Sequence, residues 1–463
     1  MVLPWPTRFV AVIDIGKTNA KLALVDLDTR SEIAALRQPN RPETTEYGYA
    51  HHDIYGLWDF VLDGLATLAR KHRIDAISVT THGATAVLLD GDGIKPLPVL
   101  DYEVEIPSRV RAHYDFIRPD FSESGSPALP LGLNLGAQLY WLQDQYPGHL
   151  ERTRAILTYP QYWCWRLSGV MASEATSLGC HTDLWNPHKR DFSTLVDIMD
   201  WRPKFPPLQP AGAFLGPVLP TIAAYTGLDP RTAVVNGIHD SNASLLPHLL
   251  RRKPPFAVVS TGTWVVAMAI GGRAVELDPA RDTLINVNAF GDPVPSARFM
   301  GGREFEMLMA DAQRSWERDD ADAVLAQGVM LLPSVIAGSG PFPARQAEWC
   351  PSEPTGGMRL VAVSFYLAMM TATCLDLIGA EGATIVEGPF ATNRPFLDML
   401  AAATGRAAIG HDGDVSGTSI GAALLAAVGA MDRLEEPAPE ASADDAALRR
   451  YAQLWRARLT ERA

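Results

Sequence analysis

A short polar turn near the N-terminus carries the first residues whose types and spacing suit chemistry. An apolar run ends in Asp14, a second alternating run follows, and between them lie Gly16, Lys17, Thr18 and Asn19. Backbone N–H groups and a threonine hydroxyl donate to phosphoryl oxygens, and a carboxylate faces a cation. The pattern predicts a β-hairpin whose tip holds a metal–phosphate group. A surface hairpin with a polar tip is the alternative.

The Gly16-Lys17-Thr18 tripeptide is not the end of a P-loop. That motif needs a glycine five residues before the Gly-Lys pair, where this chain has Ala11. It also needs a helix to follow, and residues 21–25 have the composition of a strand. A P-loop is therefore excluded.

A second turn of the same design lies in the other half of the chain. Phe256 opens an apolar strand, a second apolar strand ends at Ile270, and the turn between them contains Thr261, Gly262 and Thr263. Repetition at this scale predicts two domains of similar topology, each of which begins with a β-turn-β phosphate hairpin.

Asp240 is the candidate catalytic residue. It follows a predicted strand over residues 232–236 and opens a predicted helix, whose dipole favours an ionised carboxylate. In phosphoryl transfer through a loose transition state, a base only has to orient an acceptor hydroxyl and take its proton late. A His239-Asp240 pair also suits a metal-dependent phosphohydrolase, but that class needs further histidine and aspartate ligands.

The composition describes an ordinary globular chain with two domains. The 463 residues exceed what one core usually serves, and a net charge of −13 with no basic block argues against nucleic acid as the main partner. The four cysteines form no disulfide framework, which favours a reduced cytoplasm. No signal peptide is expected, and the uncharged stretch over residues 360–375 is predicted to be a buried helix, not a membrane span.

The elements that must position these residues alternate between helix and strand. A helix is predicted over residues 57–72 and strands over 74–81 and 86–90, which indicates an α/β architecture. Residues 107–200 are mainly helical and rich in tryptophan and tyrosine, which form a core or wall a pocket for sugar faces. The Arg/Lys/Pro segment at 251–255 is the expected domain boundary.

Five motifs in order give nearly the whole chain a resemblance to the FGGY carbohydrate kinases, of the actin-like ATPase superfamily. The motifs begin at Asp14, Gly237, Ser260, Glu387 and Gly417. The resemblance implies two ribonuclease-H-like domains with an interdomain cleft. It also implies a sugar-binding and catalytic domain over residues 1–250 and a nucleotide-binding domain over residues 251–463.

The resemblance further implies ATP-dependent phosphorylation of a sugar hydroxyl, with Mg²⁺. Asp240 matches the family's catalytic base and Asp14 the carboxylate near the metal. The residues expected to bind the nucleotide are Gly16, Lys17, Thr18, Asn19, Thr261, Gly262, Thr263, Gly388 and Asn393, with residues 416–421 bordering the adenosine. The sugar is expected at His82, Gly83 and Asp240.

The acceptor is expected to be a ketose. The motifs look most like kinases of the 6-deoxy sugars L-fuculose and L-rhamnulose, with pentulose kinases as competitors. Lys17 stands where many members have a small residue or threonine, so it adds a charge to the phosphates or points outward. Residues 100–105 lack an arginine that many members have, which leaves Asp101 or Glu105 as alternative ligands of sugar hydroxyls.

Two other classes of function remain as alternatives. An actin-like ATPase switch would hydrolyse ATP without a small acceptor, and a catalytically silent relative would bind sugar only. Retention of both Asp14 and Asp240 disfavours the silent relative. The expected partner is a small-molecule sugar, without nucleic acid or membrane, and a homodimer is compatible with the chain.

Overall fold

The computed structural model describes residues 6–44, 47–91, 98–411, 417–427 and 445–461. The chain divides into two compact units. The first contains the chain up to Arg251 with Ile285–Pro293 and Val415–Leu434, and the second contains Arg252–Leu284, Val294–Asp414 and Glu435–Ala463. The assignment of sugar binding to residues 1–250 and nucleotide binding to residues 251–463 stays a prediction.

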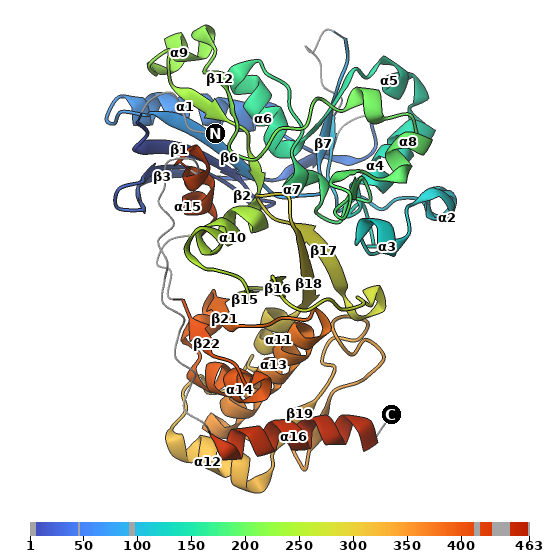
Figure 1. Ribbon diagram of the computed structural model, residues 1–463, viewed down its shortest axis with the longest axis vertical. Helices are drawn as coiled ribbons and strands as arrows, with labels where there is room; N and C mark the ends of the chain where they lie inside the picture. The colour runs from blue at the N-terminus through green and yellow to red at the C-terminus, as the bar shows by residue number, and fades with distance from the viewer. Residues whose placement is uncertain (1–5, 45–46, 92–97, 412–416, 428–444, 462–463) are drawn as a thin grey trace. The chain divides into compact units, whose positions relative to one another are not determined.

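The first unit is built on a seven-stranded mixed sheet (Figure 1). Its order is β12 (Phe214–Pro217), β13 (Ala233–Val235), β6 (Ala76–Thr81), β1 (Phe9–Ile15), β2 (Asn19–Asp26) and β3 (Ser31–Pro39), with β14 (Ile238–His239) beside β6. The predicted first hairpin is confirmed, since β1 and β2 pair antiparallel from Phe9–Asp26 to Ile15–Ala20. In contrast, β1, β13 and β14 all run parallel to β6.

Alternate residues of β1 face two different cores. Ala11, Ile13 and Ile15 join one apolar cluster, and Val10 and Val12 join another. Because side chains alternate along a strand, both faces of the sheet need cover. The first cluster includes side chains of α1 (Ile54–Ala69) and α6 (Tyr159–Ser168), and the second includes those of α10 (Asp240–Arg251) and α15 (Gly417–Leu424).

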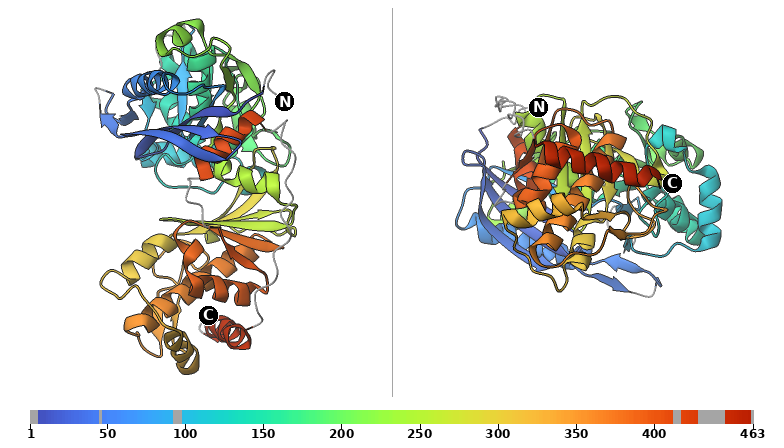
Figure 2. Two further views of the ribbon diagram at one scale, coloured as in Figure 1. Left: turned by 90° about the vertical axis from the view of Figure 1, so that its left-hand side faces the viewer. Right: turned by 90° about the horizontal axis from the view of Figure 1, so that it is seen from below.

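The second unit is built on a six-stranded sheet with a related topology (Figure 2). Its order is β17 (Thr283–Val287), β18 (Pro293–Phe299), β16 (Val265–Ile270), β15 (Phe256–Thr261), β21 (Ala383–Glu387) and β22 (Ala408–Gly410), and the unit boundary falls within β17, after Leu284. Here β15 pairs antiparallel with β16 and parallel with β21, as β1 pairs with β2 and β6. The predicted repetition of a β-turn-β opening is confirmed.

One long apolar helix, α13 (Gly356–Leu377), lies in the core of the second unit (Figure 1). It is the one helix of the described chain that is long and apolar enough to cross a membrane, and 83% of its apolar window is buried within the protein. Its side chains pack with those of α14 (Arg394–Thr404) and α16 (Ala446–Glu461). The prediction of a buried helix over residues 360–375 is confirmed.

The aromatic-rich residues 107–200 belong to the first unit, and several of their aromatic side chains are buried in its cores. They include α2 (Ser108–Ile117), α4 (Leu135–Gln145) and β9 (Ala155–Thr158), and β9 pairs antiparallel with β7 (Ala86–Leu89). Tyr114, Tyr159, Tyr162 and Trp163 are each at most 1% exposed. Tyr159 also lies against His52 and His82, with ring centroids 5.4 and 5.2 Å away.

We predict that Gly421→Ala destabilises the first unit, because α15 crosses α10 at this glycine. A Cβ on Gly421 would lie 1.7 Å from the carbonyl oxygen of Ala243, whereas one on Gly417 of the same helix meets nothing closer than 3.9 Å. Forcing the helices apart should cost about 2 kcal/mol or more, which exceeds the ~1 kcal/mol gained in helix propensity. Denaturant unfolding measures this, and equal stability of Gly421→Ala and Gly417→Ala would contradict it.

Candidate functional site

The first turn closes on itself and on one neighbouring side chain. The Gly16 N–H donates to the Asn19 carbonyl at 2.9 Å, and Asn40 Nδ2 donates to the Gly16 carbonyl at 2.8 Å. A Cβ on Gly16 would lie 3.2 Å from that Asn19 oxygen, so any larger residue at this position would crowd the turn. Thr18 and Asn19 are exposed and hydrogen-bond each other at 3.0 Å.

Asp14 is a largely buried carboxylate at the end of β1. Burial raises its pKa to about 6, and although Lys21 opposes the shift, Asp240 and Glu32 add to it. Lys21 Nζ lies 3.7 Å from Asp14 Oδ2 but only 2.8 Å from Glu32 Oε1, so one cation serves two acids. The charge on Asp14 is therefore incompletely compensated by its neighbours.

A divalent cation bound with a nucleotide fits this carboxylate. No group of three or more His, Cys, Asp or Glu side chains forms a metal cluster within the described residues. Mg²⁺ usually keeps several waters and takes one or two carboxylates together with substrate phosphates. Asp14 therefore suits a cation whose other ligands are water and phosphate.

Parallel pairing with β6 brings the predicted acceptor residues to one edge of the sheet. Ile15 of β1 and His239 of β14 are both opposite Thr81, and the His82 N–H donates to the Ile15 carbonyl at 2.9 Å. A Cβ on Gly83 would lie 2.8 Å from His239 Nε2. His82, Gly83 and Asp240, which are far apart in sequence, thus lie in one neighbourhood near Asp14.

Asp240 begins α10, and one of its carboxylate oxygens is held in place. The Ser241 N–H donates to Oδ1 at 2.6 Å and the Ser241 hydroxyl at 3.2 Å, while His239 Nε2 lies 3.3 Å away. The preceding backbone is fixed as well, because the His239 N–H donates to Thr176 Oγ1 at 3.1 Å. These contacts with Ser241 and His239 all involve Oδ1 and none of them uses Oδ2.

Cys180 is a member of this neighbourhood that the sequence patterns did not indicate. Its Sγ lies 3.4 Å from His239 Nε2, and both side chains are buried. Burial raises the pKa of the thiol, but His181 and His239 outweigh it and bring the pKa to about 5. For His239, burial lowers the pKa, while Cys180 and Asp240 outweigh it and raise the pKa to about 9. Cys180 and His239 therefore favour each other's charged form beside Asp240.

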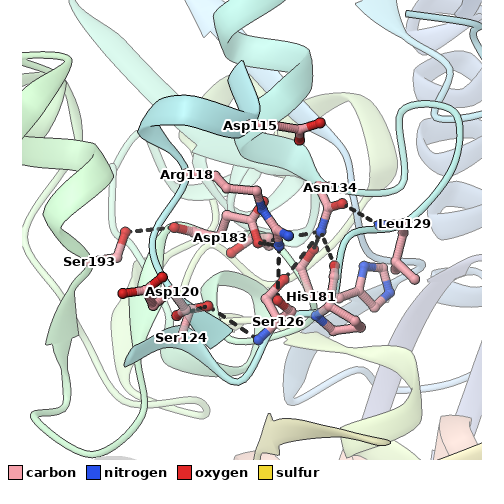
Figure 3. Close-up of polar contacts among 12 residues, drawn as sticks. Asp115, Arg118, Asp120, Ser124, Ser126, Leu129, Asn134, His181, Asp183 and Ser193 are labelled. Atoms are coloured by element: carbon pink, nitrogen blue, oxygen red, sulfur yellow. Dashed lines mark hydrogen bonds and ion pairs between the residues drawn. The ribbon is translucent and has the colours of Figure 1, made fainter. Parts of the chain in front are cut away.

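A buried ion pair holds the loop that delivers Cys180 (Figure 3). Arg118 Nη2 donates to Asp183 Oδ1 at 2.9 Å and Tyr114 donates to Asp183 Oδ2 at 2.6 Å. Asn134 Nδ2 donates to the His181 carbonyl at 2.9 Å, and Figure 3 shows it converging on the same aspartate. Both His181 and Asp183 have positive φ, so these bonds stabilise a strained turn.

In the second unit, the turn after β15 is joined to the turn after β21. Thr261 Oγ1 donates to the Glu387 carbonyl and accepts from the Phe390 N–H. Gly388 has φ +81°, and a Cβ there would lie 2.0 Å from the Thr261 carbonyl oxygen, so only glycine fits. Gly262 and Thr263 are exposed beside it. The structure thus brings the predicted residues of these two turns together.

The other residues that were predicted to bind or border the nucleotide do not lie in these two turns. Asn393 caps α14, since its Oδ1 accepts from the Phe396 N–H at 3.1 Å, and its Nδ2 donates to Ser364 Oγ at 3.0 Å. Gly421 lies in α15 of the first unit, against α10. Ser416 lies outside the described residues. Lys17 extends away from its turn and pairs with Asp101 and Glu103.

The chain belongs to the FGGY family of carbohydrate kinases. Residues 9–113 and 114–247 match its N-terminal domain, and residues 253–435 match the FGGY carbohydrate kinase C-terminal domain. The chain is similar to a carbohydrate kinase from Novosphingobium aromaticivorans, at 36% identity and a TM-score of 0.88 over 99% of both chains. The fold is also that of a ligand-bound xylulose kinase from Lactobacillus acidophilus, at 17% identity and a TM-score of 0.79 over 98% of this chain and 97% of that one.

Curated relatives match over a shorter stretch. An L-fuculokinase from Salmonella typhi is 26% identical over 276 residues, which is 57% of each chain. A probable L-xylulose kinase from Pasteurella multocida is 26% identical over 274 residues, 56% of this chain and 55% of that one. The chain thus spans about half the length of the curated relatives it matches. The predicted family and the two-domain actin-like fold are confirmed.

We predict that Asp14→Asn raises stability at neutral pH. With a pKa near 6 in the fold and 3.8 as the ordinary value, the folded state binds the proton more tightly. As the pH rises from about 4 to about 6, this group lowers the free energy of unfolding of the wild type by about 1–3 kcal/mol. Above that range its effect no longer changes. The variant should lack that fall.

Thermal or denaturant unfolding between pH 4 and pH 8 measures the effect. Asp59→Asn, on the exposed side of α1, is the matched control and should leave the pH profile unchanged. A wild-type profile parallel to that of Asp14→Asn across this window would contradict the assignment.

Proposed function

We propose that this protein transfers the γ-phosphoryl group of ATP to a hydroxyl of a ketose. The observation that carries the proposal is the meeting of Asp14, His82 and Asp240 at the carboxyl ends of adjoining strands. That edge is where ligands bind in sheets of parallel strands. Family membership supports the same reaction class.

Asp240 acts as the base. With Oδ1 held by Ser241, its carboxylate has little rotational freedom, and Oδ2 accepts the hydrogen bond of the acceptor hydroxyl. As the phosphoryl group is transferred, the hydroxyl proton passes to Oδ2, a late transfer that suits a loose transition state.

The phosphates are bound by turns and by a cation. Exposed Thr18 and Asn19 of the first unit supply donors to phosphoryl oxygens. Taken by itself, the second unit offers backbone donors at the joined turns of Thr261 and Gly388. Asp14 would hold Mg²⁺ through its carboxylate, and the ion would neutralise charge on the phosphoryl oxygens. The low charge compensation of Asp14 in the protein alone supports this role.

A 6-deoxyketohexose such as L-fuculose or L-rhamnulose, or a pentulose, is the proposed acceptor. Relatives with the names L-fuculokinase, rhamnulokinase and L-xylulose kinase support this class. His82 and Gly83 contribute to its binding, since they adjoin His239 and Asp240. A homodimer and a cytoplasmic location stay predictions.

We predict that Asp240→Asn reduces kcat at least about 100-fold while ATP affinity changes little. The amide keeps the shape of the side chain but cannot take the proton. Coupled ADP release across pentuloses, 6-deoxyhexuloses, glycerol and alditols measures turnover, and calorimetry measures ATP binding. Asp59→Asn is again the matched control.

Three outcomes would contradict the proposal. Near-normal turnover by Asp240→Asn would show that Asp240 is not the base. ATP turnover that no sugar stimulates would favour an ATPase switch, and sugar binding without product would favour a silent sugar-binding relative.

A further inference from the structure

The side chain of Lys17 does not follow its turn towards the exposed tip. Its Nζ pairs with Asp101 Oδ1, lies 3.2 Å from Glu103 Oε2 and sits 4.5 Å from the centroid of the Tyr102 ring. The side chain is 18% exposed and that of Asp101 only 1%. A lysine desolvated between two acids and an aromatic face is committed to this pairing, since breaking a buried pair leaves an uncompensated charge.

Asp101 is held rigidly by one oxygen. Its Oδ1 accepts from Lys17 and from the Glu103 N–H at 2.9 Å, and its own N–H donates to the Ala50 carbonyl at 2.9 Å. It follows β8 (Val99–Leu100), which pairs with β5 (Ala50–His52). Burial raises the pKa of Asp101, but the Glu103 N–H and Lys17 outweigh it, so the carboxylate stays ionised. The other oxygen, Oδ2, is buried with no partner in the described protein.

Two buried histidines in the same region also carry unpartnered nitrogens. The His52 and His82 rings lie 5.0 Å apart, and His52 interacts electrostatically with Asp101. Burial lowers the pKa of both rings and so favours their neutral forms. His82 Nδ1 donates to the Gly83 carbonyl at 3.0 Å, which makes Nε2 an acceptor. That Nε2 and both nitrogens of His52 are without partners among the described residues.

These unpartnered atoms belong to neighbouring side chains, and each of them can form a hydrogen bond to a ligand. Leaving a buried polar atom unpaired destabilises the fold, and such atoms in a native protein point to a missing water or ligand. His82 connects the cluster to the proposed base, because Gly83 contacts His239 and His82 interacts electrostatically with Asp240. We call Asp101, His52 and His82 the acceptor cluster.

We propose that Lys17 is a specificity-determining residue of the acceptor site, which holds Asp101 so that the acceptor cluster binds neighbouring hydroxyls of a neutral sugar. Asp101 Oδ2 and His82 Nε2 both accept, so each needs a ligand that donates, as hydroxyl groups do. Asp101, Glu103 and Asp240 bring three carboxylates to this region, so the negative charge of a sugar acid is disfavoured there. This inference rests on the proposed function and replaces the phosphate contact expected for Lys17.

Steady-state kinetics of Lys17→Met separates the two roles. If Lys17 holds the acceptor cluster, KM for the ketose rises about tenfold or more and KM for ATP stays within about twofold, because only the acceptor loses hydrogen bonds. Lys17→Arg should recover part of the ketose affinity, and Lys71→Met, an exposed lysine after α1, is the control. A rise in KM for ATP with an unchanged KM for the ketose would overturn the inference.

A second variant, Asp101→Asn, and ligand-binding calorimetry test the inference independently of turnover. Asp101→Asn should weaken ketose binding without weakening ATP binding, and its thermal unfolding shows whether it folds. Ketose binding unchanged in both Lys17→Met and Asp101→Asn overturns the inference, even when the wild type shows full kinase turnover. A wild type that binds ketose but releases no ADP refutes the proposed function, and the calorimetric comparison of the variants still decides the role of Lys17.

Discussion

Strand β6 is the constraint on which the site of the first unit depends. Parallel pairing places the carboxyl ends of β1 and β14 level with its own, so that Asp14, His82 and Asp240 come together although more than 220 residues separate the first from the last. Parallel strands need long crossover connections, and here those connections supply the aromatic-rich helices and the loop that carries Cys180. The position of each reactive group therefore follows from backbone hydrogen bonds before any side-chain contact is considered.

Charge pairing then divides the acids of the site into two kinds. Asp183 is buried and firmly paired with Arg118, and it holds its segment in place. Asp101 pairs with Lys17 through one oxygen, and its other oxygen has no partner among the described residues. Asp14 shares Lys21 with Glu32, and the Ser241 hydrogen bonds to Asp240 use Oδ1 alone. Groups that are fully compensated within the protein are suited to structure, whereas incompletely compensated groups are suited to cations and substrates. This difference separates residues that position the site from those that meet ligands.

The sequence predicted the parts of the fold that local pattern determines. Alternating apolar residues with a glycine-centred turn identified both hairpins, and the buried helix followed from its uncharged run. The sequence pattern did not reveal that α15, near the end of the chain, covers the sheet of the first unit. Its small residues predict close packing but do not indicate which element it packs against. Cys180 was missed for a similar reason, since a lone cysteine carries no spacing signal.

Residue types and short spacings were enough to identify the repeated β-turn-β design, the family motifs and the acids at strand ends. Which charges meet depends on how distant segments pack in the folded chain. Lys17 is next to a predicted phosphate turn in sequence, yet its flexible side chain reaches Asp101, 84 residues away. The sequence identified Gly388 only as part of a motif. The structure shows why glycine is needed there, because a Cβ would lie 2.0 Å from the Thr261 carbonyl oxygen. Such long-range contacts arise from packing, which no local pattern encodes.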